Sequence, residues 1–342
     1  MIGSSYGGSR FAQALAALAA LGATTLASVA NADMGGVGFW LPGGMGSLAA
    51  VPTQPGWGIT DVYLHLNASA TGGTALQQNA AIVAGLHAQA DAVAILPSYT
   101  FATPVLGGQL TLAVAGVPGR VGIGIDATLT GPGGNQISGS ALDSRATWAD
   151  VYYLGTLKWN QGVNNYMVYL LGNIPSGTYD STRLANLSIG YVGVDSGFGY
   201  TYFDPKTGHE FSAVAGLTYS TPNTALQYQN GIDSHLDWAA SQFLSKNFQI
   251  GLAGYFYQQL TGDSGAGAKL GPFRGRSVGI GPQVGFLFPA WQGYQGYLNV
   301  RGYRDVSTEN RPTTSTIMVT LGFSPAAPTA PTPRGPMYTK AQ

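Results

Sequence analysis

The segment that decides the fold is Thr314-Ser315-Thr316-Ile317-Met318-Val319-Thr320-Leu321-Gly322-Phe323, near the end of the chain. Every second residue from Ile317 to Phe323 is apolar, and the residues between them are small or largely polar. Successive side chains of a β-strand point to opposite faces, so one face of this strand is apolar. About a dozen upstream segments show the same alternation, which is typical of strands between lipid and a lumen. The pattern predicts an all-β fold, a transmembrane antiparallel β-barrel of an outer membrane.

Residues 1–32 have the features of a signal peptide. Arg10 supplies the positive charge, Phe11 to Leu26 is an apolar stretch rich in Ala and Leu, and Ala30-Asn31-Ala32 is a small-x-small cleavage site. We therefore expect cleavage before Asp33 and export of the remaining chain.

The composition excludes several other classes of protein. Charged residues make up 9% of the chain, against about 25% in ordinary soluble domains. A formal net charge of +0 argues against nucleic-acid binding, which depends on neutralising phosphates. No apolar run after Leu26 approaches the ~20 residues of a membrane-spanning helix, so only a closed barrel could pair its backbone groups within lipid. A soluble secreted β-protein is the alternative, but we would expect it to have more surface charge and shorter strands.

The alternation predicts about twelve strands, and the connections between them are alternately short and long, as in outer-membrane barrels. This count puts both ends of the barrel on the side of the short turns. The predicted strands are about 57–70, 87–101, 109–129, 147–159, 165–173, 186–203, 211–219, 228–244, 248–260, 277–288, 291–303 and 314–323. The predicted long loops are 71–84, 130–145, 174–185, 221–227, 262–276 and 306–313.

Residues 33–56 precede the barrel, which we assign to residues 57–323, and show no strand period. Phe39, Trp40, Leu41 and Pro42 lie here among many glycines. Glycine and proline favour tight turns, and the apolar side chains need burial. We predict that this N-terminal segment lies in the barrel lumen as a plug; a periplasmic linker is the alternative.

The same segment carries a resemblance to a known family. The string Phe39-Trp40-Leu41-Pro42-Gly43, then Gly46-Ser47-Leu48-Ala49-Ala50-Val51-Pro52, then Pro55-Gly56-Trp57, resembles the opening of the outer-membrane family named for the meta-cleavage pathway of phenol degradation. Pro175-Ser176-Gly177-Thr178-Tyr179-Asp180 is similar to the family's Pro-x-Gly-x-Tyr-Asp loop. The resemblance covers residues 34–323. It implies a barrel akin to fatty-acid and aromatic-hydrocarbon channels that admit apolar compounds.

The end of the chain departs from that family. Such barrels usually end on the aromatic residue that closes the last strand, whereas Phe323 is followed by residues 324–342, rich in Pro, Ala and Thr. This composition predicts a disordered tail.

Candidate lumen-lining residues follow from strand parity. They are Tyr63, His65, Asp150, Lys158, Asp233, His235, Asp237, Tyr255 and Arg301. Their charges are sparse and mixed in sign, which favours weakly polar or aromatic solutes over ions. The alternative is that these charges only pair with one another across a lumen too narrow to conduct.

We predict no catalytic residue, metal or cofactor. A serine hydrolase needs its serine within hydrogen-bond reach of a histidine. Ser234 adjoins His235, but adjacent strand residues face opposite sides. Two carboxylates, Asp233 and Asp237, flank His235 on one face. A hydrogen-bonded cluster explains this arrangement better than a metal site.

The third predicted strand changes its apolar parity at Pro118-Gly119. Leu110, Leu112 and Val114 occupy even positions, but the apolar residues after Gly119 occupy odd ones. An inserted residue forms a β-bulge, and proline within a sheet is confined to bulges or edges. We predict a bulge here that either bends the barrel or leaves a lateral exit to the bilayer.

Together these features predict a monomeric outer-membrane channel that takes up small hydrophobic compounds, aromatic ones among them. Its expected partners are outer-membrane lipid, the solute and, during biogenesis, the barrel-assembly machinery. A structural or adhesive barrel without transport is the alternative.

Overall fold

The structure is a computed structural model, and it describes residues 38–70, 76–78, 81–83, 85–130, 136–269, 271–272, 274–291 and 293–327. The predicted signal peptide and the C-terminal tail from residue 328 onward lie outside these residues. No helix in the described part is long and apolar enough to cross a membrane.

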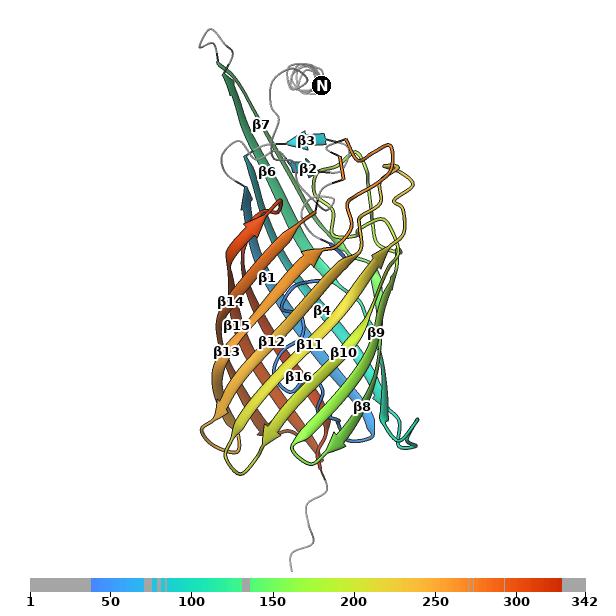
Figure 1. The fold of residues 1–342 in the computed structure, drawn as a ribbon, viewed down its shortest axis with the longest axis vertical. Helices are drawn as coiled ribbons and strands as arrows, with labels where there is room; N and C mark the ends of the chain where they lie inside the picture. Colours follow the sequence, from blue (N-terminus) through green and yellow to red (C-terminus); the bar gives the residue numbers. More distant parts are fainter. Residues whose placement is uncertain are drawn as a thin grey trace, which may run out of the picture.

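The described strands form an antiparallel barrel that closes where β1 pairs with both β16 and β4 (Figure 1). The sheet has fourteen strands: β1 Gly56–Ala70, β4 Leu86–Thr100, β5 Gln109–Ala115, β6 Pro118–Thr130, β7 Gln136–Trp148, β8 Val151–Gln161, β9 Asn164–Ile174, β10 Gly193–Asp204, β11 His209–Ser220, β12 Asp233–Phe243, β13 Phe248–Gln259, β14 Arg276–Pro289, β15 Tyr294–Glu309 and β16 Thr313–Pro325. A separate two-stranded sheet contains β2 Leu76–Gln78 and β3 Ala81–Val83.

At two places around the barrel, two short strands lie end to end where a single long strand would otherwise run. The first such pair is β5 and β6, which both pair with β4. The second is β7 and β8: β8 pairs with β5, and β7 pairs with β6. Counting each pair once reduces fourteen strands to twelve in the described part of the chain. The prediction of an outer-membrane barrel of about twelve strands is confirmed.

Some predicted boundaries are wrong. The predicted long loop 130–145 is largely strand, because β6 and β7 continue as a hairpin past the rest of the wall (Figure 1). Small and polar residues make up most of β7, so its alternation is weak in the sequence. Two predicted strand starts lie too early: β10 begins at Gly193 and β12 at Asp233. The residues before them belong to long connections.

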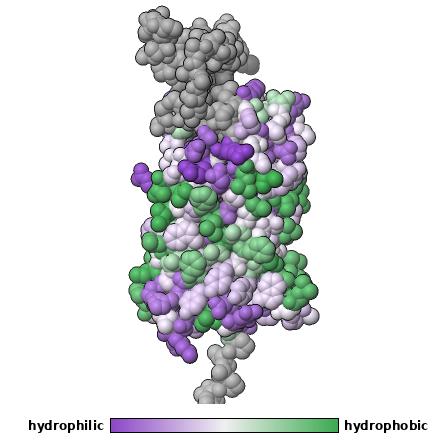
Figure 2. Space-filling model, in the orientation of Figure 1, coloured by the Kyte–Doolittle hydropathy of each residue, from purple (hydrophilic) through white to green (hydrophobic). Residues whose placement is uncertain are grey.

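Most of the outer wall is apolar, as lipid contact requires. Figure 2 shows hydrophobic side chains over the middle of one face, with hydrophilic ones toward both ends. Exposed apolar residues include Leu170, Phe198, Leu252 and Ile317, each at least 49% exposed. At the short-turn end, aromatic rings pack against one another: Trp57 on Tyr99, Tyr99 on Phe101, and Trp291 on Phe323. Such an aromatic girdle marks the membrane interface of barrels of this type.

The wall formed by β1 and β4 is reversed, and two predicted lumen residues are therefore wrong. Tyr63 and His65 point outward, where both hydrogen-bond Asp91 of β4 at 2.7 Å. The apolar residues of β1, from Val62 to Ala68 at even positions, line the interior. Parity identified the two faces correctly, but the rule that the apolar face meets lipid fails here because the lumen itself is apolar on this side.

The predicted bulge at Pro118 and Gly119 is also wrong. Along β4, Ser98 lies opposite Ala113 and Ala92 opposite Gly119, six steps on each strand, so no residue is inserted. Gly119 is paired on its other side as well, with Thr147 of β7. The expected unpaired exit at this position is therefore absent from the described wall.

The extra residue lies in the neighbouring strand. Ala115 is opposite Tyr152 and Pro118 opposite Trp148, so three steps along β5–β6 match four along β7–β8. Odd positions face the lumen on both sides of the break, since Ala113, Ala115 and Val121 all line the interior. The apolar side of this wall thus changes from lipid-facing to lumen-facing without a change in strand register against β4.

The topology gives a labelling prediction. Cysteines at Ala225 and Ala266, exposed in long connections, should react with an impermeant maleimide on whole cells, and cysteines at Gln161 and Lys206 in short turns should not. Long connections of such barrels face the cell exterior. Labelling in the opposite sense would mean that the barrel is inverted.

Candidate functional site

The described part of the N-terminal segment, residues 38–55, lies inside the barrel (Figure 1). Asp237 of β12 holds its first turn: the Gly43 N–H donates to one carboxylate oxygen at 2.9 Å and the Met45 N–H to the other at 3.0 Å. Gly43 has φ of +78°, and a Cβ atom there would lie 2.7 Å from the Tyr303 ring. Glycine is therefore required where the chain turns toward Asp237.

A second carboxylate, Glu210 of β11, holds the next turn of the segment. It accepts hydrogen bonds from the Ser47 hydroxyl at 2.9 Å and the Leu48 N–H at 3.1 Å. The Ala50 N–H then donates to the Thr201 hydroxyl at 3.1 Å. Buried backbone N–H groups need such acceptors, so the polar lumen residues of β10 to β12 form a receptor for this segment.

Trp40 fixes the start of the segment against His235 of β12. The two rings stack at 3.6 Å between centroids and 11° between planes. Nε2 of His235 lies 3.1 Å from Asp195, and the Tyr169 hydroxyl donates to the same carboxylate at 2.6 Å. Trp40 and His235 are only 3% and 4% exposed, so this is a packed, hydrogen-bonded cluster.

Three further predicted lumen residues, Tyr255, Asp233 and Asp150, lie at separate places in the barrel. Tyr255, in the lumen, donates to Asp305 at 2.6 Å, and Asp233 is fully buried. Asp150 holds the β9–β10 connection at two points, through the Gly177 N–H near its start and the Ser188 hydroxyl near its end. Among the described groups of His, Cys, Asp and Glu, none has an arrangement that could hold a metal ion.

The other plug residues occupy the same lumen. The Phe39 ring lies 5.9 Å from that of Tyr152. Leu41 packs against the buried cluster that contains Tyr255 and Met318, and Pro42 follows it in a half-buried turn.

The segment fills only part of the lumen and leaves a cavity of about 750 Å³ beside it. One side of this cavity is the segment itself, from Gly38 to Gln54. The other side is the apolar inner face of β1, β4 and β6, which contributes Val62, Leu64, Leu66, Leu86, Ala88, Ala90, Ala92, Ala94, Leu96, Val121 and Ile123. Along β1 the cavity extends from Gly58 to Ala68, about 33 Å at the rise of a strand.

Sequence reasoning missed this apolar wall. Alternation alone cannot say which of two faces looks inward, and the rule that an apolar face meets lipid puts Val62, Leu64 and Leu66 of β1 outside. The number of small residues on the even positions of β4, with four alanines from Ala88 to Ala94, is the one available signal. Small side chains leave room inside a narrow barrel.

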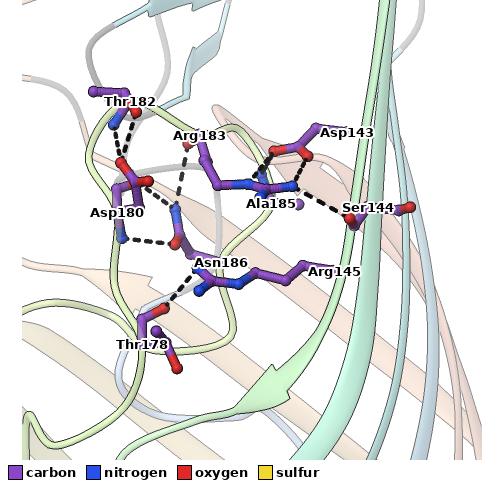
Figure 3. Close-up of polar contacts among 9 residues, drawn as sticks. All are labelled: Asp143, Ser144, Arg145, Thr178, Asp180, Thr182, Arg183, Ala185 and Asn186. Atoms are coloured by element: carbon purple, nitrogen blue, oxygen red, sulfur yellow. Dashed lines mark hydrogen bonds and ion pairs between the residues drawn. The ribbon is translucent and has the colours of Figure 1, made fainter.

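At the long-loop end, the edge of β7 that faces β9 has no strand partner among the described residues. The β9–β10 connection lies along it instead (Figure 3). Arg183 forms an ion pair with Asp143, the Ala185 N–H donates to the same carboxylate at 3.0 Å, and Arg145 donates to the Thr178 carbonyl at 3.2 Å.

This connection also covers the apolar wall. Leu184 and Leu187 pack on the cluster that contains Leu86 and Ile123. The connection therefore forms the upper boundary of the cavity.

The comparisons with known proteins agree with this geometry. The family described as "Putative MetA-pathway of phenol degradation" matches residues 71–321. An outer membrane channel from Pseudomonas putida F1 is similar in structure, with a TM-score of 0.61 and 13% identity over 80% of this chain and 96% of that one. No curated protein matches the chain.

Two further structures are similar at a lower level. A Pseudomonas aeruginosa FadL homologue has a TM-score of 0.41 and 10% identity, covering 87% of this chain and 98% of that chain. The CymD monoaromatic hydrocarbon channel has a TM-score of 0.41 and 8% identity, with coverage of 80% and 89%.

Proposed function

The chain belongs to this phenol-degradation family, and from that premise we propose that it is an outer-membrane channel for the uptake of small hydrophobic compounds, aromatic ones among them. The cavity beside the N-terminal segment supports this proposal most directly. Its volume lies within the range of about 300–1,000 Å³ typical of small-molecule sites, and its wall is apolar over most of the barrel height.

The proposal includes the N-terminal segment as a plug. The segment contacts the lumen through hydrogen bonds to side chains rather than through a strand ladder. Such contacts can be exchanged one at a time for water, so the segment can shift without opening the barrel. We place the protein in the outer membrane as a monomer, assembled by the barrel-assembly machinery.

A structural barrel without transport is the competing function. In such a barrel a long apolar cavity would only be destabilising, because the atoms that line an empty space lose packing contacts. The histidine rings of the described residues bond Asp91, Asn67, Tyr169 and Asp195 rather than a serine or threonine hydroxyl, and we also propose that the protein is not an enzyme.

The test is phenol entry into vesicles whose outer leaflet is lipopolysaccharide, with and without the purified protein. We expect faster entry with the protein and a return toward the empty-vesicle rate in Ala90→Trp, because Ala90 lines the cavity. Val93→Trp, outward-facing on the same strand, should remain as fast as the wild type. Entry no faster than into empty vesicles would leave the structural role as the better account.

A further inference from the structure

The charges around the cavity are all of one sign. Lys158 of β8 and Arg301 of β15 are the charged side chains among the described residues that line it, and no aspartate or glutamate does so. Asp237, Glu210 and Asp195 lie on the far side of the N-terminal segment: Asp237 and Glu210 accept its N–H groups, and Asp195 is bound by Tyr169 and His235. Asp150 lies behind the upper boundary of the cavity, where it accepts hydrogen bonds from the Gly177 N–H, the Ser188 hydroxyl and the Ile189 N–H. The segment thus divides the lumen into a polar half that holds it and an apolar half with two cations.

Neither cation has a carboxylate within ion-pair distance among the described residues. The Lys158 ammonium donates to the Val51 carbonyl at 3.3 Å, and no carboxylate is within ion-pair distance of it in the described structure. Arg301 donates from Nη2 to the Gly44 carbonyl at 2.9 Å, and its buried Nε has no hydrogen-bond partner. A cation removed from bulk water is usually paired with an anion, because carbonyl oxygens compensate only part of the lost hydration.

Hydroxyl groups accompany Lys158. Thr156 lies two residues earlier on the same face of β8, and Thr111 is opposite it on β5. The Thr111 hydroxyl is 2.9 Å from that of Thr100, which is 3.1 Å from that of Thr53. All four threonines line the cavity. An ammonium group beside several hydroxyl donors is chemically suited to a carboxylate, which accepts about four hydrogen bonds.

We propose that the cavity selects amphipathic organic anions, compounds with a compact aromatic body and one carboxylate, and that Lys158 is the residue that binds the carboxylate. The aromatic body lies against the apolar wall of β1 and β4, and the carboxylate displaces part of the contact between Lys158 and Val51. This inference rests on the proposed uptake function and narrows its substrate class from hydrophobic compounds in general to hydrophobic acids.

The test compares three probes of matched size by equilibrium dialysis against the purified full chain in detergent: benzoate, benzyl alcohol and benzylamine. We expect benzoate to bind about tenfold more tightly than benzyl alcohol, a difference of about 1.4 kcal/mol, since hydrogen bonds to charged groups are stronger than neutral ones. Benzylamine should bind most weakly. Added salt should weaken benzoate binding and leave benzyl alcohol binding unchanged.

Variants locate the effect. Lys158→Gln should abolish the preference for benzoate over benzyl alcohol without changing benzyl alcohol binding, and Lys158→Arg should keep it. Lys206→Gln, in a short turn outside the cavity, is the matched control. Retention of heat-modifiable migration on gels shows that each variant is folded. If Lys158→Gln is not folded, the preference of the wild type for benzoate over benzyl alcohol, and the effect of salt on it, decide whether the cavity has an anion site.

The outcomes separate this inference from the proposed function. Equal binding of benzoate and benzyl alcohol by the wild type, or an unchanged preference in folded Lys158→Gln, overturns the anion site while phenol entry into vesicles still supports a channel. Absence of binding by all three probes overturns the anion site, and the vesicle assay then decides separately whether uptake itself is wrong.

Discussion

Removal of residues 38–52 is expected to raise the single-channel conductance of the barrel several-fold. The segment occupies one half of the lumen, and the residues that it covers, Asp237, Glu210 and Thr201, are polar. Once uncovered they will be hydrated, so the vacated space will conduct ions. Planar-bilayer recordings of the shortened protein against the full chain measure the effect.

The control for this deletion replaces residues 38–52 by a Gly/Ser linker of equal length. It retains the mass of the segment and loses its hydrogen-bonding and stacking side chains, so it too should conduct better than the wild type. If both variants fold, as judged by heat-modifiable migration, and conduct no better than the full chain, the segment does not restrict the lumen.

Asp237→Ala is expected to release the segment without shortening it. The Gly43 and Met45 N–H groups lose their acceptors, and each buried donor left unsatisfied costs about 1–3 kcal/mol. We expect frequent transitions to a high-conductance state in bilayer recordings. The fluorescence of Trp40 should also change, because Trp40 is stacked on His235, two residues before Asp237 on β12.

Two matched variants frame that result. Asp237→Asn keeps one carbonyl acceptor and should give an intermediate frequency of opening. Asp126→Asn also removes a carboxylate from a barrel strand, but Asp126 is exposed on the outer face of β6. This variant should leave the recordings unchanged. A quiet channel in folded Asp237→Ala would mean that the other contacts hold the segment by themselves.

The sequence was sufficient to predict the barrel because its evidence is local. Alternation with a period of two, as in Ile317 to Phe323, identifies a strand from a few residues. Strand parity likewise predicts Lys158 of β8 in the lumen, and the structure places it there, with Thr156 on the same face. In both strands an apolar or aromatic outer face opposes a more polar inner one.

The reversed wall could not be predicted in the same way. In β1 the alternation is clear, but its apolar side faces a cavity and its polar side, with Tyr63 and His65, faces outward. A choice between the two faces depends on what lies across the lumen, which is the distant segment at Phe39 to Ala49. The inserted residue near Ala149 was missed for a related reason, since register is a relation between two strands and leaves little trace in either one.

The free edge of β7 changes how the β9–β10 connection should be regarded. A complete ring of strands has no edge, but among the described strands the ring is open above Trp148, and an open edge is a template for unwanted pairing. The connection protects it with side-chain contacts whose positions must match alternate residues of β7: Asp143, Arg145 and Thr147. The β9–β10 connection has the composition of a solvent-exposed loop, but its length and the spacing of its contacts are constrained like those of a strand. Replacing it with the corresponding loop of a related barrel would therefore leave the edge of β7 unprotected.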